Sequence, residues 1–461
     1  MPPISSSNTN PHDFNKPYIV TIDVGGQLFQ TTIQTLTLAG SNTLFSTLFN
    51  PSEQNIPFVD RDPELFSILL SLLRTGNLPS KAKTFEIQDL VFEAKFYGVE
   101  DLLVQSQLNP SQFEPFDLEK STILPLTGRD SPSAIATTPH GSVHVSHGSK
   151  ITSFDWSLKR KSTTLTQFTA IDSLVSLSPN VVAAGASDFC GLQIIDLEMG
   201  FVKKTLDWEN VTKSWSTVQA IGTSPELLFT SFESSRRNSN SILVYDPNDG
   251  FKVVSEIGHN EIFGADLDSA IPSTKLDWIP SVNLLMASGS HSGPSGISGN
   301  IKFWDVRSGD LVSEIIEKAD CFSDIAVSDT LSAVFKIGIN SGEVSYIDFR
   351  NINSYWNCLG DSRKVLNVKK EGVGCKIESH GNQVFCSKEG ELELWSEVLM
   401  GSSTTGENAN EERIFKKNVL GRSKDVGGNR ITNLAFGGTR MFVTRKDQQC
   451  VEVWQSSVRR F

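Results

Sequence analysis

Three histidines in a short stretch are the residues of this sequence that first suggest chemistry. The imidazole nitrogens of His140, His144 and His147 could ligate a metal ion. On a strand, however, His140 and His144 share a face that His147 does not, and no carboxylate or cysteine partner is nearby in the sequence. The spacing therefore favours ordinary hairpin residues over a metal site, and we expect no bound metal.

Two motifs near the N-terminus also have a chemical and a structural interpretation. Asp60 and Asp62 could form a catalytic carboxylate pair, but Asp62 is well placed to cap a helix that begins at Pro63. Gly25 and Gly26 could start a phosphate-binding loop, but no GxGxxG or GxxxxGK[ST] follows and no helix begins there. A helix cap and a tight hairpin turn are the favoured interpretations.

The cysteines and the remaining motifs indicate neither a cofactor nor catalysis. The six cysteines have no CxxC spacing, which favours reduced, mostly buried thiols over disulfides or structural zinc. Hydrolase motifs such as GxSxG and HExxH are absent. We therefore expect a protein that is not an enzyme and has no cofactor. The six cysteines of the sequence are Cys190, Cys321, Cys358, Cys375, Cys386 and Cys450.

Composition and charge narrow the class of protein. The net charge is −12 with no basic stripe, so nucleic-acid binding is not expected. No stretch reaches about 18 continuous apolar residues, and the first residues have no apolar core, so we expect neither a membrane span nor a secretory signal. A cytoplasmic location is predicted, with a nuclear location as a second possibility.

The elements that position these residues fall into two parts. Residues 1–16 read as a flexible tail, 17–108 as a compact α/β unit, 109–120 as a linker, and 121–461 as a strand-rich region. Within the first unit we expect strands, helices with the Asp62 cap and a Gly76 stop, and short connections. Their predicted bounds are strands at 18–23, 28–33 and 58–59, and helices at 41–49, 63–75, 84–97 and from 102.

The first unit resembles the BTB/POZ fold of potassium-channel tetramerisation domains and their relatives. The blocks that carry the resemblance are IDVGG at 22–26 with FQTT at 29–32, FVDRDP at 58–63 with LLRTG at 72–76, and FYGV at 96–99. The resemblance implies a self-associating protein-binding module of two, four or five copies. Because the unit has no cysteine, the intersubunit zinc site of some channel domains is not expected.

Many relatives of this kind bind cullin-3 and serve as substrate adaptors of a RING ubiquitin ligase. From the resemblance, the cullin surface would include Leu48, Phe49 and Asn50. The same resemblance implies polar contacts between subunits, and the candidate residues for that oligomer interface are Asp60, Arg61, Asp62 and Arg74.

One five-residue pattern recurs seven times in the second half. Its final positions are 41 to 59 residues apart, and it combines an apolar start, alternation, an aromatic or Ile and usually Asp. The instances are ITSFD (151–155), LQIID (192–196), ILVYD (242–246), IKFWD (301–305), VSYID (344–348), LELWS (392–396) and VEVWQ (451–455).

This period is typical of WD-type β-propellers, whose four-stranded blades bury their faces against one another. We expect seven blades, with the outer strand of the last blade supplied by about 121–126. The resemblance to WD repeats is loose, since only Trp304-Asp305 is a Trp-Asp pair and only Gly258-His259 is a Gly-His at the expected position. The fold class is therefore a multidomain chain: an α/β BTB/POZ domain followed by an all-β seven-bladed propeller.

This domain order resembles a group of plant proteins regarded as cullin-3 adaptors. The leading hypothesis is a non-catalytic substrate-recognition adaptor whose BTB unit self-associates and binds cullin-3 while its propeller binds a protein substrate. The alternative is an oligomeric scaffold that regulates a channel or signalling complex without a ligase role. An enzyme would need polar residues converging at the central channel, and the blades show no such constellation in the sequence.

Overall fold

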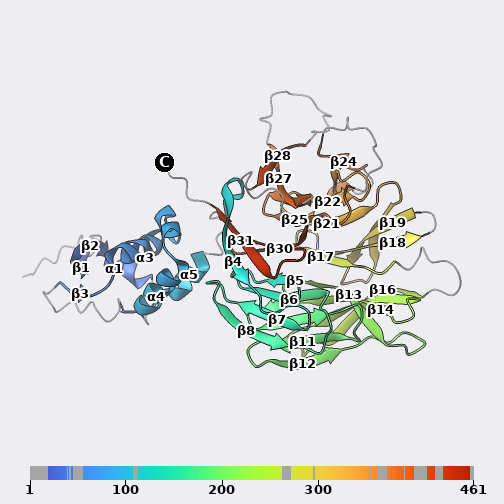
Figure 1. The fold of residues 1–461 in the computed structure, drawn as a ribbon, viewed down its shortest axis with the longest axis horizontal. Helices are drawn as coiled ribbons and strands as arrows, with labels where there is room; N and C mark the ends of the chain where they lie inside the picture. The colour runs from blue at the N-terminus through green and yellow to red at the C-terminus, as the bar shows by residue number, and fades with distance from the viewer. Residues whose placement is uncertain are drawn as a thin grey trace, which may run out of the picture. The chain divides into compact units, whose positions relative to one another are not determined.

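The computed structural model describes residues 19–38, 40, 43–44, 56–106, 113–261, 271–293, 296–351, 355–360, 371–388, 390–398, 413–420 and 429–456. The chain divides into two compact units, an N-terminal unit that ends at Gln112 and a propeller at Phe113–Ser457. Figure 1 shows the helices of the first unit and the sheets of the second. None of the helices in the described residues is long and apolar enough to cross a membrane.

A three-stranded sheet opens the N-terminal unit, with the order β2-β1-β3. β1 (Ile19–Val24) and β2 (Gln27–Thr32) form an antiparallel hairpin, and β3 (Phe58–Val59) pairs in parallel with β1. Gly25 has a φ of 58°, and a Cβ there would lie 2.5 Å from the carbonyl oxygen of Arg61. The glycine is therefore needed for both the turn and the close approach, which agrees with the predicted hairpin.

Helix bounds in this unit follow the capping residues. The Asp62 side chain accepts a hydrogen bond from Glu64 N at 2.7 Å at the start of α3, and Gly76, with a φ of 72°, ends it. The seven buried side chains of α3 include Phe66, which is fully buried. The helices are α1 (Ile33–Thr37), α3 (Pro63–Thr75), α4 (Ile87–Tyr97) and α5 (Glu100–Ser106).

Several of these bounds differ from those expected by one to three residues, including α5, which begins at Glu100 instead of 102, and two differences have a clear local cause. The second strand ends at Thr32, because the Thr32 hydroxyl accepts a hydrogen bond from Thr35 N and starts α1, which the sequence analysis did not predict. α4 begins at Ile87, since the residues before it form the 3-10 helix η1 (Ser80–Thr84). Of the helix expected at 41–49, only residues 43–44 are described, with Leu44 helical, and the remaining residues lie outside the described ranges.

Seven four-stranded antiparallel sheets make up the propeller, as predicted. We number blades 1 to 7 from the sheet that contains β5. Blades 1 to 3 consist of β5 (Pro132–Thr137), β6 (Val143–His147), β7 (Lys150–Phe154) and β8 (Arg160–Leu165); β9 (Ser173–Ser178), β10 (Val181–Gly185), β11 (Leu192–Asp196) and β12 (Phe201–Leu206); and β13 (Ser216–Thr223), β14 (Leu228–Ser234), β15 (Ser239–Asp246) and β16 (Lys252–Glu261).

The later blades follow the same strand order, except that the last one takes its outer strand from the start of the propeller. Blades 4 to 7 consist of β17 (Lys275–Ile279), β18 (Leu284–Gly293), β19 (Gly296–Asp305) and β20 (Leu311–Glu317); β21 (Phe322–Ser328), β22 (Ala333–Gly338), β23 (Val344–Asp348) and β24 (Asn357–Cys358); β25 (Lys376–His380), β26 (Gln383–Lys388), β27 (Glu391–Val398) and β28 (Ile414–Leu420); and β29 (Ile431–Gly437), β30 (Arg440–Arg445), β31 (Cys450–Ser456) and β4 (Leu118–Pro125).

The pairing of β4 with β31 closes the ring. β4 begins three residues before the expected 121, and the 3-10 helix η3 (Pro115–Asp117) precedes it, so the end of the segment expected as a linker is structured. The first strands of successive blades contact one another around the whole ring, including β29 with β5. These seven inner strands therefore surround a central channel.

The Asp that ends most copies of the five-residue pattern has a local structural role. At the end of the third strand of blades 1 to 5, its carboxylate accepts a hydrogen bond from the backbone N–H two residues later, at 2.8 to 3.0 Å, and so fixes the turn to the outer strand. The five turns of this kind follow Asp155, Asp196, Asp246, Asp305 and Asp348.

Seven apolar clusters fill the spaces between neighbouring blades. The third strands supply one buried group to each side, as in β27, where Leu394 packs toward blade 7 and Trp395 toward blade 5. Each sheet is thus covered on both faces only when the ring is complete. The fold supplies a rigid ring whose surfaces and channel are available for binding.

Candidate binding surfaces

Arg61 organises the polar contacts of the N-terminal unit. Its Nη1 lies 3.6 Å from Oε1 of Glu93, and its guanidinium carbon lies 4.0 Å from the centre of the Phe96 ring. Burial raises the pKa of Glu93, while the Arg61 charge opposes that rise. The arginine is therefore held between a buried carboxylate and an aromatic face, both on α4.

The other residues predicted for an oligomer interface have separate positions. Asp60 is exposed, and Asp62 is occupied as the cap of α3. Arg74 Nη2 donates a hydrogen bond to the Gln30 carbonyl oxygen at 2.6 Å and so joins α3 to β2. These contacts are within one chain, so the intersubunit role stays a prediction. The predicted cullin surface at Leu48, Phe49 and Asn50 lies outside the described residues.

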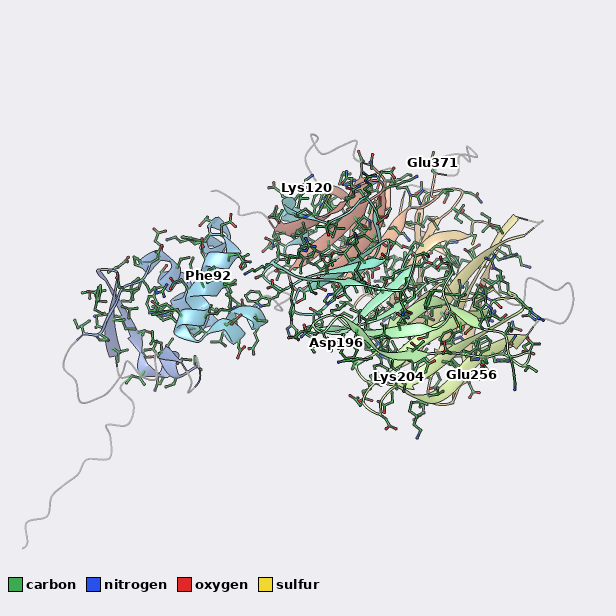
Figure 2. The ribbon with its side chains drawn as sticks, turned by 60° about the horizontal axis from the view of Figure 1, so that its bottom comes forward. Phe92, Lys120, Asp196, Lys204, Glu256 and Glu371 are labelled. Carbon is green, nitrogen blue, oxygen red and sulfur yellow. The ribbon has the colours of Figure 1, made fainter. Side chains whose placement is uncertain are left out.

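An exposed aromatic pair on α4 was missed by sequence reasoning. Phe92 is 63% exposed and Phe96 is 38% exposed, and they are four positions apart, which places them on one side of the helix. Figure 2 labels Phe92 on this unit. Their signal in the sequence is that both fall outside the buried stripe of the helix. Exposed aromatic rings beside a fixed arginine are typical of protein interfaces.

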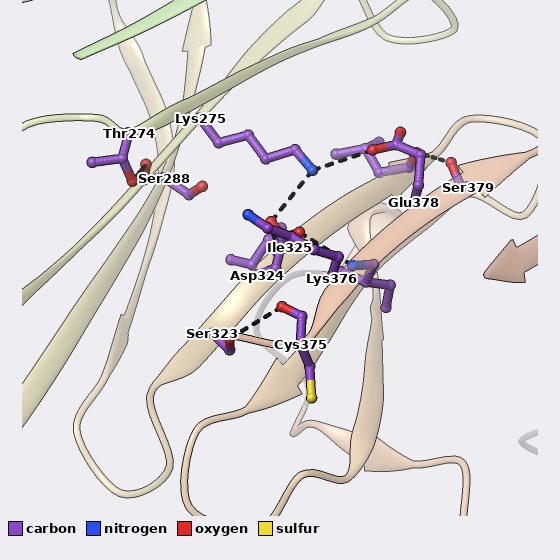
Figure 3. Close-up of polar contacts among 12 residues, drawn as sticks. Thr274, Lys275, Ser288, Ser323, Asp324, Ile325, Cys375, Lys376, Glu378 and Ser379 are labelled. Atoms are coloured by element: carbon purple, nitrogen blue, oxygen red, sulfur yellow. Dashed lines mark hydrogen bonds and ion pairs between the residues drawn. The ribbon is translucent and has the colours of Figure 1, made fainter. Parts of the chain in front are cut away.

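A cavity of about 340 Å³ lies in the propeller where the inner strands of blades 4 to 7 meet. Lys275 of β17 is held there, with Nζ 3.5 Å from Oδ1 of Asp324 on β21 and 3.5 Å from Oε2 of Glu378 on β25 (Figure 3). Asp324 is fixed in turn, because its carboxylate accepts hydrogen bonds from the backbone of Ile325 and Ile377.

Lys275 and the carboxylates of Asp277, Asp324 and Glu378 form a group of interacting charges, here called the channel cluster. Burial alone would lower the pKa of Lys275, but Asp324, Glu378 and Asp277 outweigh it and raise that pKa, so the lysine stays protonated. Burial raises the pKa of Glu378 to about 7, with Lys275 opposing the rise and the neighbouring carboxylates adding to it. Burial also raises the pKa of Asp277. Lys376 also lines the cavity, but within the described residues it forms no ion pair with these carboxylates, so Lys275 is the ammonium group that interacts with all three.

The lining limits what this cavity can do. A protonated lysine is not a nucleophile, and the described lining residues include no histidine or cysteine to pair with the serines. Glu378 can exchange a proton near neutral pH. The expectation that no polar constellation converges at the channel is wrong, because residues about 50 positions apart meet only through the ring.

The histidines form no metal site. On β6, His144 Nδ1 lies 3.0 Å from Ser153 Oγ and His147 Nε2 lies 2.8 Å from Thr152 Oγ1, so each is paired with a hydroxyl of β7. His140 is exposed in the preceding turn. Within the described ranges no group of three His, Cys, Asp or Glu side chains could hold a metal ion.

Two tryptophans that lie outside the recurring five-residue pattern, Trp208 and Trp215, differ in their surroundings. Trp208 is buried, and its Nε1 donates a hydrogen bond to Glu256 at 3.0 Å, whereas Trp215 is exposed. The same Glu256 oxygen lies 3.0 Å from His259 Nδ1, so the Gly-His found in the sequence belongs to a small polar network of blade 3. Of these two tryptophans, Trp215 is the one whose side chain is exposed to a partner.

Comparisons with known proteins agree with both units. Residues 20–107 match the family model of the BTB/POZ domain, and residues 127–456 match that of the "At2g24240-like, C-terminal beta propeller". The chain is 60% identical to the Arabidopsis thaliana "BTB/POZ domain-containing protein At5g41330" over 98% of both chains. It is 27% identical to "BTB/POZ domain-containing protein At4g30940" of the same plant, over 95% of this chain and 97% of that protein.

A shorter match is confined to part of the chain. The Bos taurus "SH3KBP1-binding protein 1" is 34% identical over 96 residues, which is 20% of this chain and 13% of that protein. The propeller model, in contrast, spans more than half of the chain, and the 60% identical relative is matched over nearly its full length. The chain therefore belongs to the family of BTB/POZ proteins, of the potassium-channel tetramerisation type, that carry an At2g24240-like C-terminal β-propeller.

Proposed function

We propose that this protein is a non-catalytic substrate-recognition adaptor of a cullin-3 RING ubiquitin ligase. Its BTB unit would self-associate and bind cullin-3, and its propeller would bind the protein to be modified. Because ubiquitin transfer takes place on other subunits, this chain needs only binding surfaces. We place it in the cytoplasm, with access to the nucleus as a second location.

The observation that carries this proposal is the joining of a BTB unit to a closed propeller, each with its own candidate binding surface. The BTB unit presents Phe92, Phe96 and Arg61. The propeller presents a polar channel without a nucleophile and base pair among its described lining residues. Copies joined through the BTB unit would present several propellers at once and raise apparent affinity for clustered substrates.

The test is capture of a cullin-3 N-terminal fragment by the full-length protein. We expect the wild-type chain to retain the fragment, and Phe49→Asp to lose it because the resemblance places this residue in the cullin surface. Lys213→Asp, which changes charge on a loop of the propeller, is the control and should retain it. Failure of the wild-type chain to bind, or full binding by Phe49→Asp, would contradict the ligase role.

A scaffold without a ligase role is the second candidate. It is favoured by the similarity of 96 residues of this chain to the Bos taurus "SH3KBP1-binding protein 1". The two functions differ in what happens to a propeller-bound partner when this protein is removed. An adaptor predicts that the partner accumulates, whereas a scaffold predicts unchanged abundance and loss of the partner's assembly.

A further inference from the structure

The geometry points to a binding site for an alkylammonium or guanidinium group in the channel cavity, held by the Glu378 carboxylate and the Ser288 hydroxyl. This inference adds ligand chemistry to the propeller half of the proposed function. It does not depend on cullin-3 or on self-association. The volume of about 340 Å³ is at the lower end of the ~300–1,000 Å³ found for small-ligand pockets.

Ser288 is the first observation that indicates a ligand. It lines the cavity and is only 2% exposed, and no hydrogen bond among the described residues satisfies its hydroxyl. Lys275 and Ser288 are directly opposite each other in the β17–β18 register, so their side chains lie on the same face of blade 4 (Figure 3). The Ser288 oxygen therefore faces the cavity without a partner among the described residues and can accept a hydrogen bond from a bound N–H donor.

The carboxylates supply the second observation. Lys275 is 3.5 Å from each of its two partners, longer than a strong charged hydrogen bond. Asp277 lies on the same strand face as Lys275, and within the described residues its carboxylate has no hydrogen bond or ion pair. Asp324 and Glu378 line the cavity together with Lys275 and Lys376, whereas Asp277 lies outside the lining, and Lys376 forms no ion pair among the described residues. Lys275 therefore leaves the Glu378 carboxylate incompletely paired, and a bound organic cation would complete the pairing.

A proton competes with this cation for the Glu378 carboxylate. The charges that act on Glu378 are those of Lys275 and Asp277 from β17 and of Asp324 from β21. β29 contributes the neutral Asn433 to the lining, and the other titratable groups of β25 are Lys376, also on the lining, and His380, whose pKa is lowered by burial. Because Glu378 titrates near pH 7, the cation should displace its proton when it binds.

The experiment is calorimetric titration of the full-length protein at pH 8. The probes are methylguanidinium, n-butylammonium, and blocked Gly-Arg-Gly and Gly-Lys-Gly peptides. The control probe is the same peptide with citrulline, which keeps the shape of arginine without its charge. We expect at least one cationic probe to bind saturably, and its affinity to fall about tenfold at pH 6, where most of Glu378 is protonated.

Two variants and a matched control test the assigned groups. Glu378→Gln should weaken binding at least tenfold and remove its pH dependence. Ser288→Ala should weaken it severalfold and guards against a folding defect in the first variant. Glu371→Gln is the control, because this exposed carboxylate pairs only with Lys388, at 3.4 Å, among the described residues and does not line the cavity (Figure 2 labels Glu371).

The possible results separate clearly. If the free cations bind, the site recognises the cationic head group alone. If only the peptides bind, the site recognises the head group as part of a protein side chain. Either result supports the site, provided that Glu378→Gln abolishes the binding. Equal binding of the citrulline peptide, no binding of any cation, or binding unchanged by Glu378→Gln overturns the inference. Since no cullin-3 is present, this result stands apart from failure of the ligase proposal.

Discussion

At the scale of single residues, burial decides the chemistry of His144. Burial, together with the charge of Lys161, lowers the pKa of His144 to about 4, so the folded protein keeps this imidazole neutral at neutral pH. In the unfolded chain the same group titrates near 6.5. Stability from this site is therefore fully present above pH 6.5 and is lost as the pH falls toward 4, because only the unfolded state gains the proton.

His144→Gln tests this linkage. A shift from 6.5 to about 4 corresponds to roughly 3 kcal/mol of unfolding free energy lost between those pH values. We expect the variant to be less stable at pH 7, because the hydrogen bond to Ser153 changes, but to lose less stability on acidification. Urea unfolding at pH 7 and pH 5 measures the slope. His140→Gln in the exposed turn should leave the slope unchanged, and equal slopes for all three proteins would refute the account.

At the scale of elements, β4 is the part of the chain that closes the propeller. Its two buried ends enter different inter-blade clusters, with Leu118 between blades 6 and 7 and Leu124 between blades 7 and 1. Lys120 adds an ion pair to the buried Glu452 of β31 at 3.5 Å, and Glu452 also lies 3.0 Å from Arg445. One strand from the beginning of the propeller thus stabilises two interfaces and one buried charge.

Leu124→Ala is expected to destabilise the propeller by about 2–5 kcal/mol, the usual cost of a cavity at a buried leucine. Ile123→Ala on the same strand is the matched control, because Ile123 is 52% exposed and should cost far less. All eight tryptophans lie after residue 120, so tryptophan fluorescence during urea unfolding reports on the propeller. Similar losses for both variants would show that β4 does not close the ring as described.

At the scale of the whole molecule, the proposed function needs copies of the chain to associate through the BTB unit. The exposed Phe92 and Phe96 beside Arg61 are the surface that this association would bury. A propeller surface with equally exposed apolar side chains, such as Met199, has no such role in the proposal. The oligomeric mass of the full-length protein therefore distinguishes the two surfaces.

Phe92→Asp should lower the mass of the full-length protein measured by light scattering, because a carboxylate in a buried apolar contact is costly. Met199→Asp should leave the mass equal to that of the wild-type chain. A wild-type protein that is monomeric at micromolar concentration would contradict self-association. An oligomer unaffected by Phe92→Asp would instead move the interface away from α4.

The sequence by itself determined the features that depend on neighbouring residues. The Asp62 cap, the Gly76 stop and the Gly25 turn follow from local hydrogen bonding and backbone geometry. The recurring Asp of blades 1 to 5 likewise fixes a turn within two residues, and the repeated five-residue pattern predicted seven blades from the sequence. α1 was the local exception, because its start depends on a Thr32 cap inside a strand-like pattern.

Only the tertiary structure decided the channel cluster. Lys275, Asp324 and Glu378 occupy separate blades, and each is an ordinary charged residue in its own strand. Their one common signal is a charged side chain on the first strand of a blade, which gains meaning only when the inner strands are known to surround a channel. Ring closure brings the three together, and burial there raises the pKa of Glu378.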